Sequence, residues 1–143
     1  MADQRLTKRR KAGEAERVDI ANLAFGEDFE EAEAMLNAEV RTVIEKLNET
    51  NQLERDDMSE MMVNTTKYVE TFGEFQDLDS ISLCKRELLE LRDLKVHGFE
   101  AASLCNLMPA TADEAKSLIA SLKRFDDEDV TQMCNIVQRY KKA

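Results

Sequence analysis

Apolar residues recur at steps of three and four along most of this chain, a spacing that predicts amphipathic helices. The first helix is predicted over about residues 27–48. Its single apolar stripe is formed by Phe29, Ala32, Leu36, Val40, Val43 and Leu47. Acidic residues crowd its start, where they are expected to favour the positive end of the helix dipole. The polar stretch over 48–57 then predicts a loop.

A heptad-like spacing marks the second predicted helix. The apolar positions step by three and four residues in strict alternation, and they are Met58, Met61, Thr65, Tyr68, Phe72 and Phe75. A seam of this kind is typical of a helix that packs lengthwise on another helix. Gly73 is expected to weaken the last turn.

The rest of the chain also carries helical spacing. Helices are predicted over about 79–94, 99–107 and 112–122, and a last helix opens at 126–129. The residue before Pro109 is disfavoured in a helix, which ends the fourth one. Thr111 and Glu114 fit a capping box that starts the fifth. Buried stripes are predicted for the third helix at Ile81, Cys84, Leu88 and Leu91, and for the last at Val130, Met133, Cys134, Val137 and Tyr140.

Residues 18–25 break this helical pattern. Val18 and Ile20 alternate with polar residues, Leu23 and Phe25 follow, and Gly26 ends the run. Alternation favours an extended segment. A lone strand leaves its backbone hydrogen-bonding groups unpaired, so we expect this piece either to stay loose or to add to the sheet edge of another chain.

Composition supports an all-α protein of one ordinary domain. The chain has 143 residues, 43% of them hydrophobic, with only 4 Gly and 1 Pro, too few turn residues for a sandwich or barrel. Its net charge of −10 is uneven: residues 1–17 hold six basic and three acidic groups, which leaves −13 on the remainder. The acidic body disfavours tight independent binding to nucleic acid.

The basic start, residues 1–17, is expected to be a disordered arm. Its run Lys8-Arg9-Arg10-Lys11 is compatible with a nuclear import signal or a phosphate-seeking patch. A solvated tail explains the same run, and the sequence leaves these alternatives open.

Candidate chemistry is sparse. Three cysteines at wide spacing form no disulfide framework and no zinc pattern, and without a signal segment they indicate a reduced intracellular compartment. A calcium-binding loop around Gly98 would place the cationic side chain of Lys95 where an oxygen ligand is required, so no calcium site is predicted there. His97 is the single imidazole and is expected to be an exposed neighbour of a helix end. The longest uncharged run, 101–112, is too short to cross a membrane. We therefore predict a protein-binding chain that is not an enzyme, with no metal and no cofactor.

Four stretches of the sequence match a family pattern. The first, 29–40, has an acidic start followed by Leu36-Asn37-Ala38-Glu39-Val40, and the second is the seam of the second helix. The third and most specific contains Phe99-Glu100, Leu104, Asn106-Leu107, Pro109, Thr111-Ala112, Glu114-Ala115-Lys116, Leu118-Ile119 and Ser121-Leu122. The fourth is 125–128 with the closing helix. Over about residues 18–142 the chain resembles the fourth subunit of eukaryotic RNA polymerase II, whose relatives include the archaeal F subunit.

This resemblance implies a fold and a partner. The fold would be an HRDC-like helical domain over 58–143, preceded by a segment over 18–57 whose strand, helix and loop clasp the seventh polymerase subunit. The heterodimer would form the stalk near the RNA exit channel, support transcription initiation and transcript handling, and contact RNA mainly through the partner. A nuclear location and no membrane contact follow.

The partner-binding residues implied are Val18, Ile20, Leu23, Phe25, Phe29, Leu36, Asn37, Glu39 and Val40. Phe29, Leu36, Val40, Tyr68 and Phe72 could equally be buried within this chain, and the sequence does not decide between these alternatives. A stalk subunit of another nuclear polymerase, or a free-standing helical adaptor, are the alternative functions.

Overall fold

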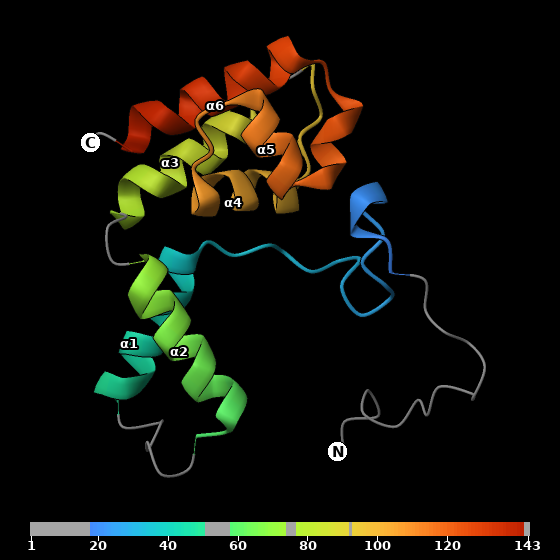
Figure 1. The fold of residues 1–143 in the computed structure, drawn as a ribbon. Coiled ribbons are helices and arrows are strands. Elements are labelled where there is room, and N and C mark those ends of the chain that lie inside the picture. The colour runs from blue at the N-terminus through green and yellow to red at the C-terminus, as the bar shows by residue number, and fades with distance from the viewer. Residues whose placement is uncertain (1–17, 51–57, 74–76, 92, 142–143) are drawn as a thin grey trace, which may run out of the picture. The chain divides into compact units, whose positions relative to one another are not determined.

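The computed structural model describes residues 18–50, 58–73, 77–91 and 93–141 (Figure 1). The expected basic arm, 1–17, lies outside these ranges. Internal contacts divide the chain into two units, Met1–Ala32 and Glu33–Ala143, and each is described by itself.

The described part of the first unit is a closed turn. A 3-10 helix, η2, covers Ile20–Asn22, and Leu23 adopts a left-handed conformation with φ of 59°. Asp19 and Ala24 exchange two backbone hydrogen bonds of 2.8 and 2.9 Å. The prediction of an extended segment over 18–25 is therefore wrong for this chain alone. The turn pairs within itself the backbone groups that an isolated strand would leave unpaired.

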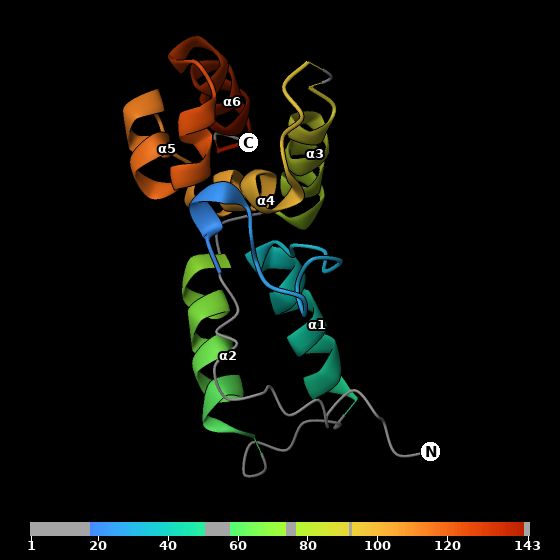
Figure 2. The ribbon, with the colours of Figure 1, turned by 90° about the vertical axis from the view of Figure 1, so that its right-hand side faces the viewer.

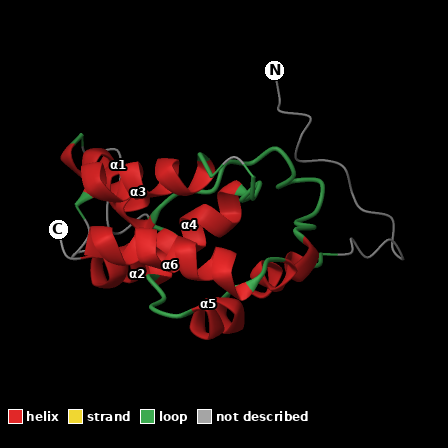
Figure 3. Cartoon of the chain, turned by 90° about the horizontal axis from the view of Figure 1, so that it is seen from above, coloured by secondary structure: helices red, strands yellow, loops and turns green. Residues whose placement is uncertain are grey.

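Every longer element of the second unit is a helix, and the described residues contain no strand, so the all-α prediction is confirmed (Figure 3). The order is α1 (Asn37–Glu49), α2 (Glu60–Gly73), α3 (Leu78–Leu89), α4 (Gly98–Leu107), α5 (Ala112–Leu118), the 3-10 helix η4 (Ala120–Arg124) and α6 (Asp127–Lys141). The predicted division at residues 57 and 58 falls between α1 and α2, which pack against each other.

Helix α1 begins ten residues later than predicted, so the expected start at 27 is wrong. Leu36 is extended, with φ of −73° and ψ of 149°. The carbonyl of Ala34 accepts a 2.6 Å hydrogen bond from Lys85 of α3 instead of a helical bond. Five acidic residues between 27 and 33 would also repel one another at spacings of three and four in a helix.

The core of the second unit lies among α3, α4, α5 and α6. Helix α6 packs against each of the other three, and α3 also packs on α4 (Figures 1 and 2). The predicted stripes of the third and last helices are confirmed, since Ile81, Cys84, Leu88, Val130, Met133, Cys134 and Val137 are all buried. Leu91 and Tyr140 pack against this core while partly exposed.

Two predicted helices end early because the chain turns to reach the core. Helix α3 stops at Leu89, and the loop after it buries Val96. Helix α5 stops at Leu118, where Ile119 is extended and 4% exposed. The chain then restarts as η4. The caps agree better with the sequence: Thr111 accepts from the backbone N–H of Glu114 at 3.2 Å, and the exposed His97 caps α4 by accepting from the N–H of Phe99 at 3.0 Å.

The three cysteines are buried, and none of them forms a disulfide. A hydrogen bond to Cys84, together with burial, raises the pKa of the Cys105 thiol far above its ordinary value. Burial also raises the pKa of the Cys134 thiol. A thiol that stays protonated inside a core acts as a small apolar side chain, which is the role predicted for Cys134. The hydrogen bond with Cys105 instead lowers the pKa of the Cys84 thiol, although the Cys84 side chain is fully buried in the same core, as predicted.

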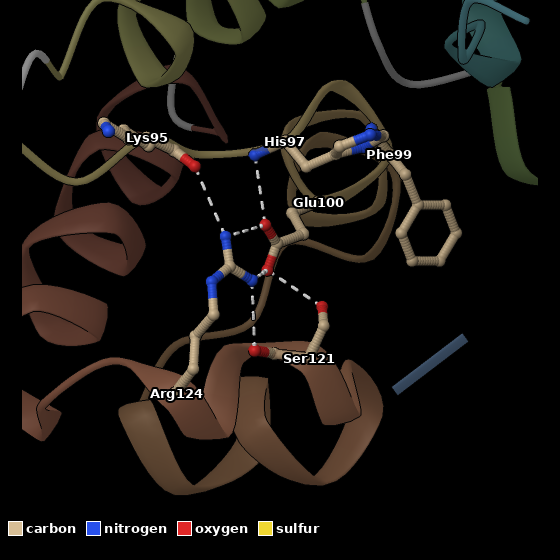
Figure 4. A network of polar contacts seen from close by, with 6 residues as sticks. All are labelled: Lys95, His97, Phe99, Glu100, Ser121 and Arg124. Atoms are coloured by element: carbon tan, nitrogen blue, oxygen red, sulfur yellow. Dashed lines mark hydrogen bonds and ion pairs between the residues drawn. The ribbon is translucent and has the colours of Figure 1, made fainter. Parts of the chain in front are cut away.

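A fully buried carboxylate, Glu100, joins three segments of the second unit (Figure 4). Arg124 of η4 donates to both of its oxygens at 2.5 and 2.6 Å. The hydroxyl of Ser121 and the backbone N–H of His97 donate to it at 2.8 and 3.0 Å. The guanidinium also donates to the carbonyl of Lys95 at 3.3 Å, so the loop, the start of α4 and η4 share one polar network.

We expect Arg124→Met to lower the free energy of unfolding by about 3 kcal/mol, because it leaves the Glu100 carboxylate buried without its ion partner. Urea unfolding followed by circular dichroism measures the loss. The double variant Glu100→Leu/Arg124→Met removes both charges and should regain much of it. A single variant that loses less than about 1 kcal/mol would show that the pair does not hold this fold together.

A second expectation concerns acid stability. Hydrogen bonds from Arg139, and then from Tyr140 at 2.8 Å, hold the pKa of the Glu87 carboxyl below its ordinary value of 4.5. A carboxyl whose pKa is lowered by folding stabilises the protein above its unfolded pKa, and this stabilisation is lost as pH falls through the folded pKa. Between about pH 7 and about pH 3.5, the wild type should lose more free energy of unfolding than Glu87→Gln does. Equal losses in the two proteins would contradict the linkage.

Candidate protein interface

Helix α2 is apolar over more of its circumference than one helical neighbour can cover. At about 100° per residue, eight of its uncharged positions form two adjacent stripes that together span about 160°. The other uncharged positions, Val63, Asn64 and Thr71, lie outside this arc. One stripe is Met62, Thr66, Val69 and Gly73, and the other is Met61, Thr65, Tyr68 and Phe72. The charged residues of α2, which are Glu60, Lys67 and Glu70, lie on the opposite side of the helix.

The first of these stripes packs on α1. Val69 is 3% exposed and Ile44 of α1 is 6% exposed. Arg41 donates to the carbonyl of Gly73 at 3.4 Å. A Cβ on Gly73 would lie 3.6 Å from the backbone of Asn37, so the two helices approach closely there. The first stripe is therefore the internal contact of the α1–α2 hairpin.

The second stripe is exposed. Met61 is 79% exposed, Phe72 57% and Tyr68 50%. The rings of Tyr68 and Phe72 contact each other, with centroids 4.7 Å apart and planes tilted by 44°. These are residues of the predicted seam, so the helix is confirmed, but among the described residues of the second unit its seam does not pack on another helix. The seam has two end residues. Met58 is half-buried, and Phe75 lies outside the described residues.

Helix α1 adds to the same face. Val43 is 47% exposed, and Val40 and Leu47 are half-buried beside it. On both helices the exposed stripe is rotated by about 100° from the contact stripe, in the same sense along the chain. Because α1 and α2 run antiparallel (Figure 2), equal rotations place both stripes on one side of the hairpin. We call this surface the hairpin face, and it consists of Val40, Val43, Leu47, Met61, Thr65, Tyr68 and Phe72.

The sequence-predicted partner residues fall into two groups. Val18, Ile20, Leu23, Phe25 and Phe29 belong to the first unit, where Val18, Ile20 and Phe29 are more than half exposed and the other two are half-buried.

Leu36, Asn37, Glu39 and Val40 belong to the second unit. Three of them hold α1 in place: Leu36 is fully buried in the core, the N–H of Asn37 donates to the side chain of Asn106 at 3.0 Å, and Glu39 accepts from the N–H of Leu36 at 2.7 Å. Of this group, only Val40 lies on the hairpin face.

Sequence reasoning did not assign Met61 and Val43 to a partner, and it left Tyr68 and Phe72 open between contact with a partner and burial within this chain. The signal was present in α2, because its apolar arc is too wide for one contact. The heptad-like spacing alone could not show which half of that arc packs on α1.

No group of three potential metal ligands occurs among the described residues. Each helix in the described ranges is too short or too polar to cross a lipid bilayer. A contact surface for another protein is what the arrangement offers.

Comparison with known proteins identifies relatives over most of the chain. A family model described as RNA polymerase Rpb4 matches residues 34–141. The Arabidopsis thaliana protein named DNA-directed RNA polymerase II subunit 4 is 31% identical over 90% of this chain and 99% of its own length. The rpb4 subunit of RNA polymerase II from Dictyostelium discoideum is 28% identical over 93% of this chain and 95% of its own. The corresponding protein from Schizosaccharomyces pombe is 30% identical over 78% of this chain and 83% of its own.

The different placements of Leu36 and Val43 allow a direct test. Leu36→Asp puts a carboxylate into the core, and we expect the free energy of unfolding to fall by about 4 kcal/mol. Val43→Asp places the same group on the half-exposed hairpin face and should change it by less than about 1 kcal/mol. Chemical unfolding of both variants measures the difference. Similar losses would mean that the hairpin face is buried within the chain.

Proposed function

Because this chain belongs to the RNA polymerase Rpb4 family, we propose that it pairs with the seventh subunit of RNA polymerase II and that the pair forms the stalk near the RNA exit channel. Family membership makes the chain an accessory subunit of RNA polymerase II, not a catalytic one. A nuclear location, with roles in initiation and transcript handling, completes the proposal. We further propose that residues 58–143 form the HRDC-like domain, with residues 18–57 as the clasp.

The hairpin face is the observation that carries the pairing. It exposes two aromatic rings, a methionine and a valine on one side of the α1–α2 hairpin. Aromatic residues and methionine are enriched at protein interfaces, and a contiguous exposed patch of this kind marks a binding surface. We assign this face to the seventh subunit.

The exposed side chains of the first unit support a second contact. Val18, Ile20 and Phe29 find little cover within the chain. We propose that these residues, with Leu23, Phe25 and the α1 residue Val40, contact the same partner. Leu36, Asn37 and Glu39 would act indirectly by fixing the start of α1.

Charge supports the division of roles within the pair. The chain carries a net charge of −10, which opposes contact with the phosphates of RNA. RNA would therefore be bound mainly by the partner. No membrane contact is proposed.

The proposal predicts how two variants behave. Tyr68→Glu and Phe72→Glu each place a charge in the middle of the hairpin face, and each should weaken binding to the purified seventh subunit at least about tenfold. Leu118→Glu on α5, at a residue 52% exposed, is the matched control and should bind like the wild type. Circular dichroism checks that all three fold. Unchanged binding by the two hairpin variants would remove the assignment of this face.

Affinity purification from cell extract tests the assembly itself. The tagged chain should recover the large subunits of RNA polymerase II together with the seventh subunit. Recovery of another nuclear polymerase, or of none, would favour the two alternatives, a stalk subunit of a different polymerase or a free-standing adaptor.

A further inference from the structure

We propose that, without its partner, the chain forms a homodimer through the hairpin face, so that self-association and pairing with the seventh subunit exclude each other. The exclusion rests on the proposed function, because it assigns the same face to that partner. The homodimer itself rests on the spacing, the area and the charge of the face.

The spacing of the exposed stripe on α2 suits a two-fold axis. Its positions, 61, 65, 68 and 72, are separated by four, three and four residues, which is the same in both directions along the helix. An antiparallel second copy would therefore place its Phe72 opposite Met61 and its Tyr68 opposite Thr65. Closed two-fold contacts require a patch that is complementary to itself, and knobs-into-holes packing uses this alternation of three and four residues.

The area of the face predicts a weak dimer. Aromatic side chains bury roughly 150–250 Å² each when covered. With Phe72 57% exposed, Tyr68 50%, Met61 79% and Val43 47%, each copy offers roughly 500–600 Å². The total of about 1,100 Å² lies just below the range of stable interfaces, so the dimer should be reversible and should yield to a larger interface.

The charge of the face permits the contact despite the acidic chain. Glu60, Lys67 and Glu70 lie on the far side of α2, so no charged residue of that helix enters the contact. Repulsion between two copies of net charge −10 then acts across longer distances, where salt screens it. Added salt should strengthen the dimer, which is the opposite of its effect on an ion-paired contact.

Sedimentation equilibrium of the full chain tests the homodimer. The average mass should rise from 16.4 kDa toward twice that value as concentration increases, and should rise further with added salt. Phe72→Glu should stay at 16.4 kDa, while the control Leu118→Glu should follow the wild type. A wild type that remains monomeric, or a Phe72→Glu variant that still dimerises, would overturn the proposal.

Titration with the purified seventh subunit tests the exclusion. The homodimer should disappear as a complex containing one copy of each chain forms, and a complex with two copies of this chain would overturn the exclusion. The two proposals fail separately. A monomeric wild type that binds the seventh subunit would overturn the homodimer and leave the proposed function standing. A homodimer that does not bind the seventh subunit would overturn the proposed function and leave the homodimer standing.

Discussion

The buried Glu100 carboxylate is the constraint on which the arrangement of the C-terminal helices depends. A charge taken out of water must have all of its hydrogen bonds supplied by the protein. Here the donors are the backbone N–H of His97, directly before α4, and the side chains of Ser121 and Arg124 in η4. To bring them together, the chain leaves helical geometry at Ile119 and takes a left-handed conformation at Lys95, with φ of 47°. The early end of α5 and the tight turn before α4 therefore serve this buried ion pair as well as the burial of Ile119 and Val96 in the core.

Helix α4, fixed at its start by this network, in turn fixes α1 through its other end. Asn106 accepts a hydrogen bond from the N–H of Asn37, Leu36 enters the common core, and Lys85 of α3 binds the carbonyl of Ala34. These contacts hold α1 only at its first residues. Farther along, Ile44 and Val69 are buried outside the main core, where α1 and α2 pack on each other. A hairpin attached at one end has sides that the rest of the chain does not cover.

Local signals predicted most of the helices and failed where a distant contact decided the outcome. The stripe of α6 and the cap at Thr111 depend on residues close in sequence, and both were predicted correctly. The start of α1 depends on Lys85, which is 51 residues from Ala34, and spacing alone extended that helix ten residues too far. Residues 18–25 alternate like a strand, yet two backbone bonds between Asp19 and Ala24 close them into a turn. In the candidate interface, Tyr68 and Phe72 were placed on the right helix, but only the structure showed that Val69, their neighbour, makes the internal contact.

The width of the apolar arc on α2 links this local pattern to assembly. A surface helix usually carries an apolar stripe of about 100°, and the charged residues occupy the remainder. Helix α2 exceeds that width, and burying Val69 against α1 still leaves Tyr68 and Phe72 exposed. Replacing those rings by polar residues would have little effect on the chain's own core, because neither ring belongs to it. Apolar residues that the fold does not bury expose the free chain to self-association, and they stabilise the protein only when another chain covers them. In our two proposals, the seven residues of the hairpin face therefore serve both the self-association of the free chain and its pairing with the seventh subunit.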